Sequence, residues 1–289
     1  MKAIERVAVI GAGTMGHGIA QVCALAGWRV ALTDARPEAL EPAREKIRAN
    51  LSGAVQRGKL AADAADAAVA RVALPRSVGE AVRDADLVIE AVVEDLGVKR
   101  DIFTMLDAAA PPDATLATNT SSLSVAAIAE PVADGGRVVG MHFFNPVHIM
   151  KLVEVVRHER SDPPHVDRVV TAARAMGKEP IVVRDAPGFA SSRLGVVLGL
   201  EAMRMVEQGV ATPEDIDRAM ELGYGHPMGP LKVTDLVGLD VRLAIAEYLH
   251  RRLGDDQYAP PDILRAKVRA GELGKKTGKG FYEWPTTPS

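Results

Sequence analysis

The chain has 289 residues, of which 47% are hydrophobic and 25% charged, and its formal net charge is −3. This balance excludes a disordered chain, a basic nucleic-acid-binding stripe and a polybasic membrane arm, so neither nucleic acid nor a membrane is expected as a partner. The first residues lack the apolar core of a signal peptide, and no apolar run approaches the roughly 20 residues of a membrane span. We therefore expect a cytoplasmic protein. Two domains are expected, because a domain usually has about 100 to 200 residues.

The single cysteine, Cys23, excludes an internal disulfide and a cysteine-rich zinc site. It lies in a helical pattern and is expected to be a small buried residue. The seven histidines show no HExxH motif or other close ligand spacing, so no metal is predicted.

The stretch from Val7 to Asp34 has the pattern strand, glycine turn, helix, strand, acid. In the turn, Gly11 permits a sharp bend, Gly13 lets backbone N–H groups approach a pyrophosphate, and Gly16 lets helix and strand pack closely. The phosphates would lie at the helix N-terminus, where the dipole favours negative charge.

Asp34 ends the second strand, where a carboxylate accepts hydrogen bonds from both ribose hydroxyls of NAD and repels the extra phosphate of NADP. Arg36 is a cation that could pair with such a phosphate, and we interpret it as a solvated surface charge. The pattern therefore predicts NAD as the cofactor. Its expected binding residues are Gly11, Gly13, Thr14, Met15, Gly16 and Asp34.

Helical and strand patterns alternate after Asp34, which predicts a parallel sheet covered by helices on both faces. Apolar strands such as 87–89 fit burial on both sides. Helices are expected at 37–58, 61–70, 96–109 and 164–176, and strands at 71–74, 86–93, 115–119, 137–144 and 180–184, with 151–157 extending the same domain.

The pattern changes at the turn 185–188, after which no strand pattern returns until the C-terminus. We therefore expect an α/β fold with a Rossmann-type doubly wound sheet in residues 1–184. An all-α domain, which closes over substrate and dimerises, is expected in residues 185–289.

The helix expected at 189–208 is apolar all round, and such a helix must be buried on every side. A second subunit or the first domain is needed to cover it, so a homodimer is predicted. Thr212 is expected to cap the next helix, and a single helix is expected at 230–253.

Two strand ends in the first domain carry polar side chains. The segment 119–122 lies at the carboxyl edge of the sheet, where open α/β sheets place their ligands. The alternative is a loop whose Ser122 or Ser124 caps a helix. His142 lies at another strand end, where it can exchange a proton at neutral pH, and a nearby carboxylate such as Glu154 can fix its tautomer. The alternative is a structural histidine.

Together these motifs resemble the 3-hydroxyacyl-CoA dehydrogenases, particularly the bacterial short-chain 3-hydroxybutyryl-CoA type. The resemblance runs from Val7 to about Tyr282. The matching segments are GAGTMGHGIA (11–20), EAVVE (90–94), NTSSLS (119–124), HFFNP (142–146), KLVEVV (151–156), DAPGF (185–189) and KTGKGFY (276–282).

The resemblance implies NAD-dependent oxidation of an (S)-3-hydroxyacyl-CoA thioester and the reverse reaction. It implies that His142 takes the proton of the 3-hydroxyl, that Glu154 orients this histidine, and that Ser121 contacts substrate near the nicotinamide. The NAD contacts that it implies beyond the glycine turn are Glu94, Lys99, Asn145 and Lys276.

The chain departs from the family pattern at three positions. Ser192 stands where many members carry a catalytic asparagine. Because serine is shorter, either a water bridges it to the substrate, or Ser191 assists, or the site is weaker. Asn50 and Arg57 fall on a serine and a lysine that contact CoA in the family. Arg57 can still bind a phosphate through its fork, and the alternative for both is a polar helix face.

Other functions remain open. One is a dehydrogenase of 3-hydroxyadipyl-CoA or of a CoA-free acid such as gulonate, and Asn50 and Arg57 favour CoA if they line one groove. Another is a noncatalytic NAD-binding protein, as lens crystallins related to this family are, for which Ser192 is the only sequence support. The chain has neither the YxxxK pair of the short-chain dehydrogenases nor the cysteines of the zinc-dependent dehydrogenases, so both of these classes are excluded.

Overall fold

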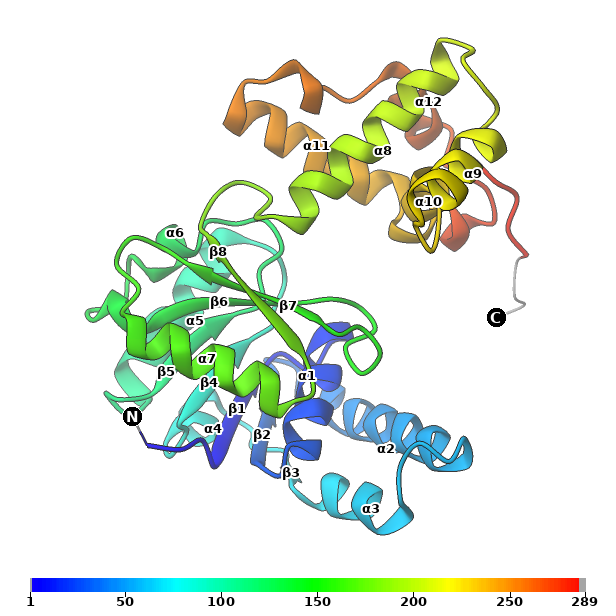
Figure 1. The fold of residues 1–289 in the computed structure, drawn as a ribbon. Coiled ribbons are helices and arrows are strands. Elements are labelled where there is room, and N and C mark those ends of the chain that lie inside the picture. The colour runs from blue at the N-terminus through cyan, green and yellow to red at the C-terminus, as the bar shows by residue number, and fades with distance from the viewer. Residues whose placement is uncertain (1, 286–289) are drawn as a thin grey trace. The chain divides into compact units, whose positions relative to one another are not determined.

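A computed structural model describes residues 2–285. The chain divides into two compact units, one ending at Ala186 and the other beginning at Pro187. The first unit holds an eight-stranded sheet in the order β3-β2-β1-β4-β5-β6-β7-β8 (Figure 1). Its strands are β1 (Arg6–Ile10), β2 (Arg29–Thr33), β3 (Val72–Ala73), β4 (Leu87–Glu90), β5 (Thr115–Thr118), β6 (Val138–Phe143), β7 (Leu152–Arg157) and β8 (Glu179–Arg184).

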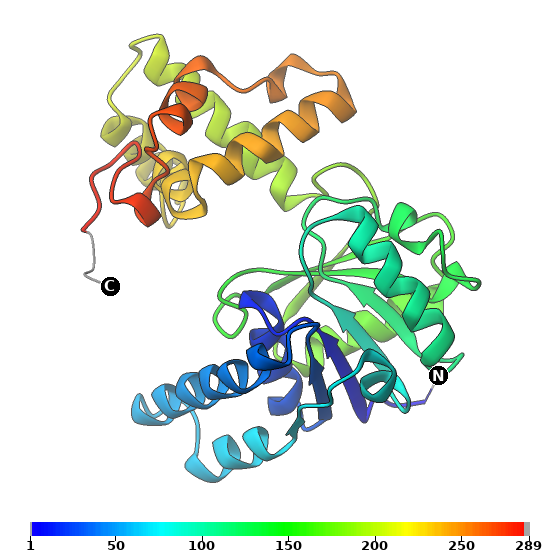
Figure 2. The ribbon, with the colours of Figure 1, turned by 180° about the vertical axis from the view of Figure 1, so that it is seen from behind.

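Helices cover both faces of this sheet, which confirms the Rossmann-type doubly wound fold. One face shares its core with α1, α2, α3 and α7, and Figure 1 shows α7 in front of the strands. Figure 2, seen from behind, brings the teal helix α5 to the front. The helices of this unit are α1 (Thr14–Leu25), η1 (Pro37–Ala39), α2 (Leu40–Gln56), α3 (Ala62–Ala70), α4 (Val78–Val82), α5 (Leu96–Ala109), α6 (Val125–Ala129), η2 (Gly135–Arg137) and α7 (Pro163–Ala175). Cys23 of α1 is buried, as expected.

The sheet is not parallel throughout. Strands β1 to β6 run parallel, whereas β7 pairs antiparallel with β6 and parallel with β8. Residues 144–151 alone connect β6 to β7, and this is too short for a crossover to a parallel neighbour. The resulting hairpin register places His142 directly opposite Glu154.

Strand β4 ends at Glu90, three residues before the end expected from the sequence. Oε1 of Glu90 accepts a hydrogen bond from Val92 N at 2.7 Å, and such a local bond replaces the sheet ladder. The chain beyond β4 passes close to the glycine turn. Gly11 has φ +106°, and a Cβ on it would lie 2.6 Å from the carbonyl oxygen of Ala91, so glycine is required there.

The second unit is helical over its described residues, as expected. Its helices are α8 (Ser191–Glu207), α9 (Pro213–Tyr224), α10 (Pro230–Val237), α11 (Leu239–Leu253), η3 (Asp256–Tyr258), α12 (Asp262–Arg269) and η4 (Lys275–Thr277). Thr212 caps α9 by accepting a hydrogen bond from Asp215 N at 3.2 Å, as expected. The prediction of one helix at 230–253 is wrong, because Gly238 has φ +101° and separates α10 from α11.

Helix α8 is buried on one face only within this chain. Val196, Leu200 and Met203 lie in the core of the second unit, whereas Leu194 is 72% exposed. The complete burial expected for this helix is therefore not reached by the single chain. None of the helices within residues 2–285 is long and apolar enough to cross a membrane.

Candidate functional site

The glycine turn joins β1 to α1 at the carboxyl edge of the sheet. A Cβ on Gly16 would collide with the carbonyl oxygen of Gly11, so the fold itself needs this glycine. Gly13 differs, because a Cβ there would meet no described atom within 4 Å. Gly13 is the N-cap of α1, and no described side chain caps the helix there. Thr14 and Met15 lie in the first turn of α1. Open space beside an uncapped helix N-terminus fits the pyrophosphate of a dinucleotide.

Asp34 follows β2 and faces the same turn. Its Oδ2 accepts a hydrogen bond from Ala12 N at 2.7 Å, and its Oδ1 accepts one from Arg36 N at 2.9 Å. The guanidinium of Arg36 lies 3.9 Å from Oδ1, and its side chain is 73% exposed. A carboxylate has about four acceptor positions, so these backbone donors orient Asp34 and leave capacity for ribose hydroxyls.

His142 and Glu154 form a buried pair across the β6–β7 hairpin. Nδ1 of His142 lies 2.8 Å from Oε2 of Glu154, which is fully buried. A buried carboxylate is unfavourable without a hydrogen-bonded partner, so it favours the tautomer with the proton on Nδ1. In the neutral ring Nε2 is then the nitrogen that accepts a proton.

The loop after β5 is tied to the strand that carries His142. Oδ1 of Asn119 accepts a hydrogen bond from Phe143 N at 2.9 Å. The donors that surround Oε1 of Glu94 are Thr120 Oγ1 at 2.7 Å, Ser121 N at 2.8 Å, Ser121 Oγ at 3.1 Å, Ser122 N at 3.1 Å and Ser122 Oγ at 3.3 Å. The helix cap in this region is Ser124, which accepts a hydrogen bond from Ala127 N at the start of α6.

Glu94 is held as an anion. Burial alone would raise its pKa, but the ammonium of Lys99 and hydrogen bonds from Thr120 and Ser121 outweigh burial and place the pKa below its usual value. Nζ of Lys99 lies 3.5 Å from Glu94 Oε2 and 2.6 Å from Glu90 Oε1.

Sequence reasoning singled out Glu94 and Lys99 but not Glu90. The available signal was a carboxylate inside the apolar strand pattern expected at 86–93, where an unpaired charge would be costly.

The remaining residues expected to bind NAD or act on substrate lie apart from this cluster in the chain. Asn145 is exposed just beyond β6. In the second unit, Ser192 lies in the first turn of α8, and Lys276 lies in η4. Nζ of Lys276 is 2.6 Å from both carboxylate oxygens of Asp240. Burial would raise the pKa of Asp240, but the bonds from Lys276 lower it.

Asn50 and Arg57 line one cavity of about 760 Å³ beside α2. The cavity also holds the cationic side chains of Lys59, Lys151 and Lys178, together with His148. The pKa of His148 is lowered by burial and by neighbouring cations, which include Lys178 and Arg57. This concentration of positive charge fits an anionic ligand such as a phosphate.

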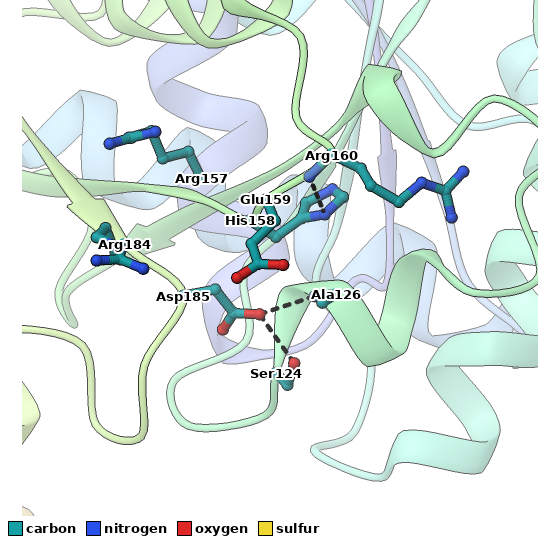
Figure 3. Close-up of a pocket in the computed structure, with 8 residues that line it drawn as sticks. All are labelled: Ser124, Ala126, Arg157, His158, Glu159, Arg160, Arg184 and Asp185. Carbon is teal, nitrogen blue, oxygen red and sulfur yellow. Dashed lines mark hydrogen bonds between the residues drawn. The ribbon is translucent and has the colours of Figure 1, made fainter.

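A separate hollow of about 440 Å³ contains none of the predicted site residues (Figure 3). Arg157 and Arg184 stand side by side at the ends of β7 and β8. Asp185 accepts hydrogen bonds from Ser124 Oγ and Ala126 N, both at 2.8 Å. Acids and bases are interspersed around the hollow, and the Ser124 hydroxyl that donates to Asp185 also caps helix α6. The candidate active site is therefore at the glycine turn and the ends of β4 to β6.

A Rossmann-type sheet whose glycine turn faces an acid, beside a buried histidine–glutamate pair, is the arrangement of a dinucleotide-dependent dehydrogenase. The family model described as "3-hydroxyacyl-CoA dehydrogenase, NAD binding domain" matches residues 6–186, and "3-hydroxyacyl-CoA dehydrogenase, C-terminal domain" matches residues 188–284. The chain belongs to the 3-hydroxyacyl-CoA dehydrogenase family. It is an oxidoreductase that uses NAD and acts on 3-hydroxyacyl-CoA thioesters.

The similarity to known proteins covers nearly the whole chain. A "probable 3-hydroxybutyryl-CoA dehydrogenase" of Bacillus subtilis is 43% identical over 281 residues, which cover 97% of this chain and 98% of the relative. The crystal structure of (S)-3-hydroxybutyryl-CoA dehydrogenase PaaH1 from Ralstonia eutropha superposes with a TM-score of 0.95 at 36% identity, covering 98% of this chain and 100% of that one. The 3-hydroxyadipyl-CoA dehydrogenase of Escherichia coli is 42% identical over 97% of this chain and 59% of its own length.

Proposed function

We propose that His142 and Glu154 perform the proton transfer in the oxidation of an (S)-3-hydroxyacyl-CoA, with 3-hydroxybutyryl-CoA as the substrate. The supporting observation is the buried contact of 2.8 Å between His142 Nδ1 and Glu154 Oε2. Nε2 of His142 takes the proton of the 3-hydroxyl and returns it in the reverse reaction. Glu154 holds the tautomer and balances the charge of the imidazolium. NAD, when bound, accepts the hydride from C3.

Ser121 is proposed as the contact to the substrate oxygen, since Asn119 joins its loop to the strand of His142. We assign NAD to the glycine turn and Asp34, and Ser192 to the substrate. Further NAD contacts are proposed at Glu94, Lys99, Asn145 and Lys276, on the resemblance to the family.

The CoA part of the substrate is proposed to bind at Asn50 and Arg57. These residues line the same cavity, which is the condition under which they favour a CoA thioester over a CoA-free acid. The short acyl chain is inferred from the relatives that are named as 3-hydroxybutyryl-CoA dehydrogenases. Arg57→Ala is expected to raise KM for the thioester several-fold with kcat retained. Arg48→Ala, on helix α2, which ends just before Arg57, is the matched control, because Arg48 pairs with Glu45 at the surface.

A homodimer formed through the helical unit is proposed as the working state, in the cytoplasm. Large apolar side chains are exposed on this unit, among them Leu194, Leu222 and Tyr224. They lie on α8 and α9, which both pack against α10. A second copy of the chain would cover them. Light scattering should give the mass of two chains, and a monomeric mass at assay concentrations would contradict this assignment.

The reaction is tested by NADH consumption with acetoacetyl-CoA. Parallel assays use a longer 3-ketoacyl-CoA, 3-ketoadipyl-CoA, free acetoacetate, and NADPH in place of NADH. Fast turnover of acetoacetyl-CoA with NADH, and none of free acetoacetate, is expected. If NADH binds but no thioester turns over, the proposed substrate is wrong, and a CoA-free hydroxy acid or a noncatalytic role takes its place.

A further inference from the structure

We propose that Glu90 is a positioning residue of this enzyme, which fixes the hydroxyl of Ser121 through Lys99 and Glu94. The inference rests on the proposed role of Ser121 as a substrate contact. It assigns a purpose to a fully buried charge at the end of β4 that the proton transfer by His142 does not use.

Glu90 is a carboxylate enclosed by three donors. Oε1 accepts hydrogen bonds from Lys99 Nζ at 2.6 Å and from Val92 N at 2.7 Å, and Oε2 accepts one from Thr118 Oγ1 at 2.7 Å. Because its side chain is fully buried, the carboxylate has no access to a ligand. Any effect that it has on the reaction must pass through the groups that it holds.

Lys99 is the first of these groups, and its side chain is only 1% exposed. Its ammonium lies between two carboxylates, with Glu90 at 2.6 Å and Glu94 Oε2 at 3.5 Å. A buried ammonium is costly to leave unpaired, so the close contact with Glu90 fixes where this charge stands. Lys99 therefore acts on the site mainly by orienting Glu94.

Glu94 transmits this position to Ser121. While Lys99 holds Oε2, the other oxygen accepts hydrogen bonds from both the backbone N–H and the hydroxyl of Ser121, at 2.8 and 3.1 Å. A rotation of the Glu94 carboxylate would move both donors together. Thr118 connects Glu90 to the Ser121 loop by a second, shorter route. Its Oγ1 donates to Glu90 and accepts a hydrogen bond from Thr120 N at 3.3 Å.

The test is a double-mutant cycle between Glu90→Gln and Ser121→Ala. Gln keeps the shape of the side chain and removes its charge, so the ammonium of Lys99 is drawn toward Glu94 alone. We expect Glu90→Gln to lower kcat with acetoacetyl-CoA, measured at saturating NADH, by about tenfold. In the Ser121→Ala background the same substitution should change kcat by less than about twofold, because both act through one hydroxyl.

Asp86→Asn is the matched control, since Asp86 is a buried carboxylate just before the other end of β4. It should lower stability and leave kcat and its response to Ser121→Ala unchanged. Should Glu90→Gln fail to fold, Glu90→Asp takes its place in the cycle, because it keeps the buried charge and draws the carboxylate back from Lys99 by one methylene.

Equal losses of kcat in both backgrounds would overturn the proposal and leave Glu90 as a stabilising residue. A Ser121→Ala variant with wild-type turnover would overturn it too. Neither result touches the role of His142, which is decided by its own substitution.

Discussion

Glu154 on β7 and Glu90 on β4 are both fully buried carboxylates, and each faces a side-chain nitrogen at less than 3 Å. The partner of Glu154 is the imidazole of His142, and the partner of Glu90 is the ammonium of Lys99. An imidazole exchanges protons near neutral pH, whereas an ammonium keeps its proton. A buried glutamate therefore supports proton transfer in the β6–β7 hairpin and a fixed charge at the end of β4.

The difference shows that burial alone does not identify a catalytic acid. Both pairs satisfy the need of a buried charge for a hydrogen-bonded partner. What separates them is the chemistry of the partner and its access to a ligand. Lys99 is enclosed and lies between two acids, while His142 lies at the strand end that faces the Asn119 loop.

The largest expected effect comes from removing the group that moves the proton. His142→Gln should lower kcat by about 10³-fold, within the range of about 10² to 10⁴ for a general base, because Gln cannot accept the proton. Binding of NADH should stay near normal and is measured by fluorescence. Turnover close to wild type would show that His142 does not transfer the proton. The His142–Glu154 pair would then differ from the Lys99–Glu90 pair in no catalytic respect.

Glu154→Gln is expected to lower kcat by roughly 10²-fold, with a smaller change in KM, since an amide no longer balances the imidazolium. The pH dependence of kcat should also change, because the group that exchanges the proton has lost its anionic partner. Glu90→Gln should leave the shape of that pH profile as it is. Identical profiles for wild type and Glu154→Gln would contradict the orienting role.

The glycine turn and the sheet could be predicted because local spacing encodes them. Apolar strands such as β4 and the run from Gly11 to Asp34 reveal their roles over short stretches. The break at Gly238 could not be predicted, because a glycine inside a helical pattern fits either a continuous helix or a hinge, and packing decides between them. The antiparallel β6–β7 pairing, by contrast, was open to prediction, because only residues 144–151 connect the two strands and this is too short for a parallel crossover.

The candidate site was predicted where a motif carries it and missed where it depends on distant contacts. His142, Glu154 and Ser121 stand in long motifs that resemble the family. The role proposed for Glu90 depends on the approach of Lys99, nine positions away on the next helix, and no spacing rule predicts it. Whether Ser121 faces the loop of Glu94 was equally invisible, because it requires side-chain geometry.

A third carboxylate, Asp34, has only backbone donors as its nearest partners, so it is the member of this set that is proposed to bind a ligand directly. Asp34→Ala should weaken NAD binding by about 10- to 100-fold, the loss expected for hydrogen bonds to a charged group. Discrimination against NADP should weaken at the same time. It is measured as the ratio of kcat/KM for NAD to kcat/KM for NADP. An unchanged ratio would assign the choice to Arg36 instead.

The smallest effect is expected at Asp86, a buried carboxylate that serves stability. Burial would raise its pKa, but hydrogen bonds from Glu5 N and Arg6 N at 2.8 and 2.9 Å, together with Lys2 and Arg168, hold the pKa below its usual value. Its stabilisation is therefore complete above the unfolded value of about 3.9 and is lost as pH falls through the lower folded value.

Asp86→Asn should accordingly lower the free energy of unfolding by about 1 to 2 kcal/mol at pH 7, measured in urea, with kcat unchanged. The gap between variant and wild type should shrink below about pH 4, because the wild-type carboxyl is then protonated as well. A gap that persisted at lower pH would mean that Asn disturbs packing rather than charge. Glu90→Gln, by contrast, should change kcat at pH 7, so this comparison separates a carboxylate that stabilises the fold from one that positions the site.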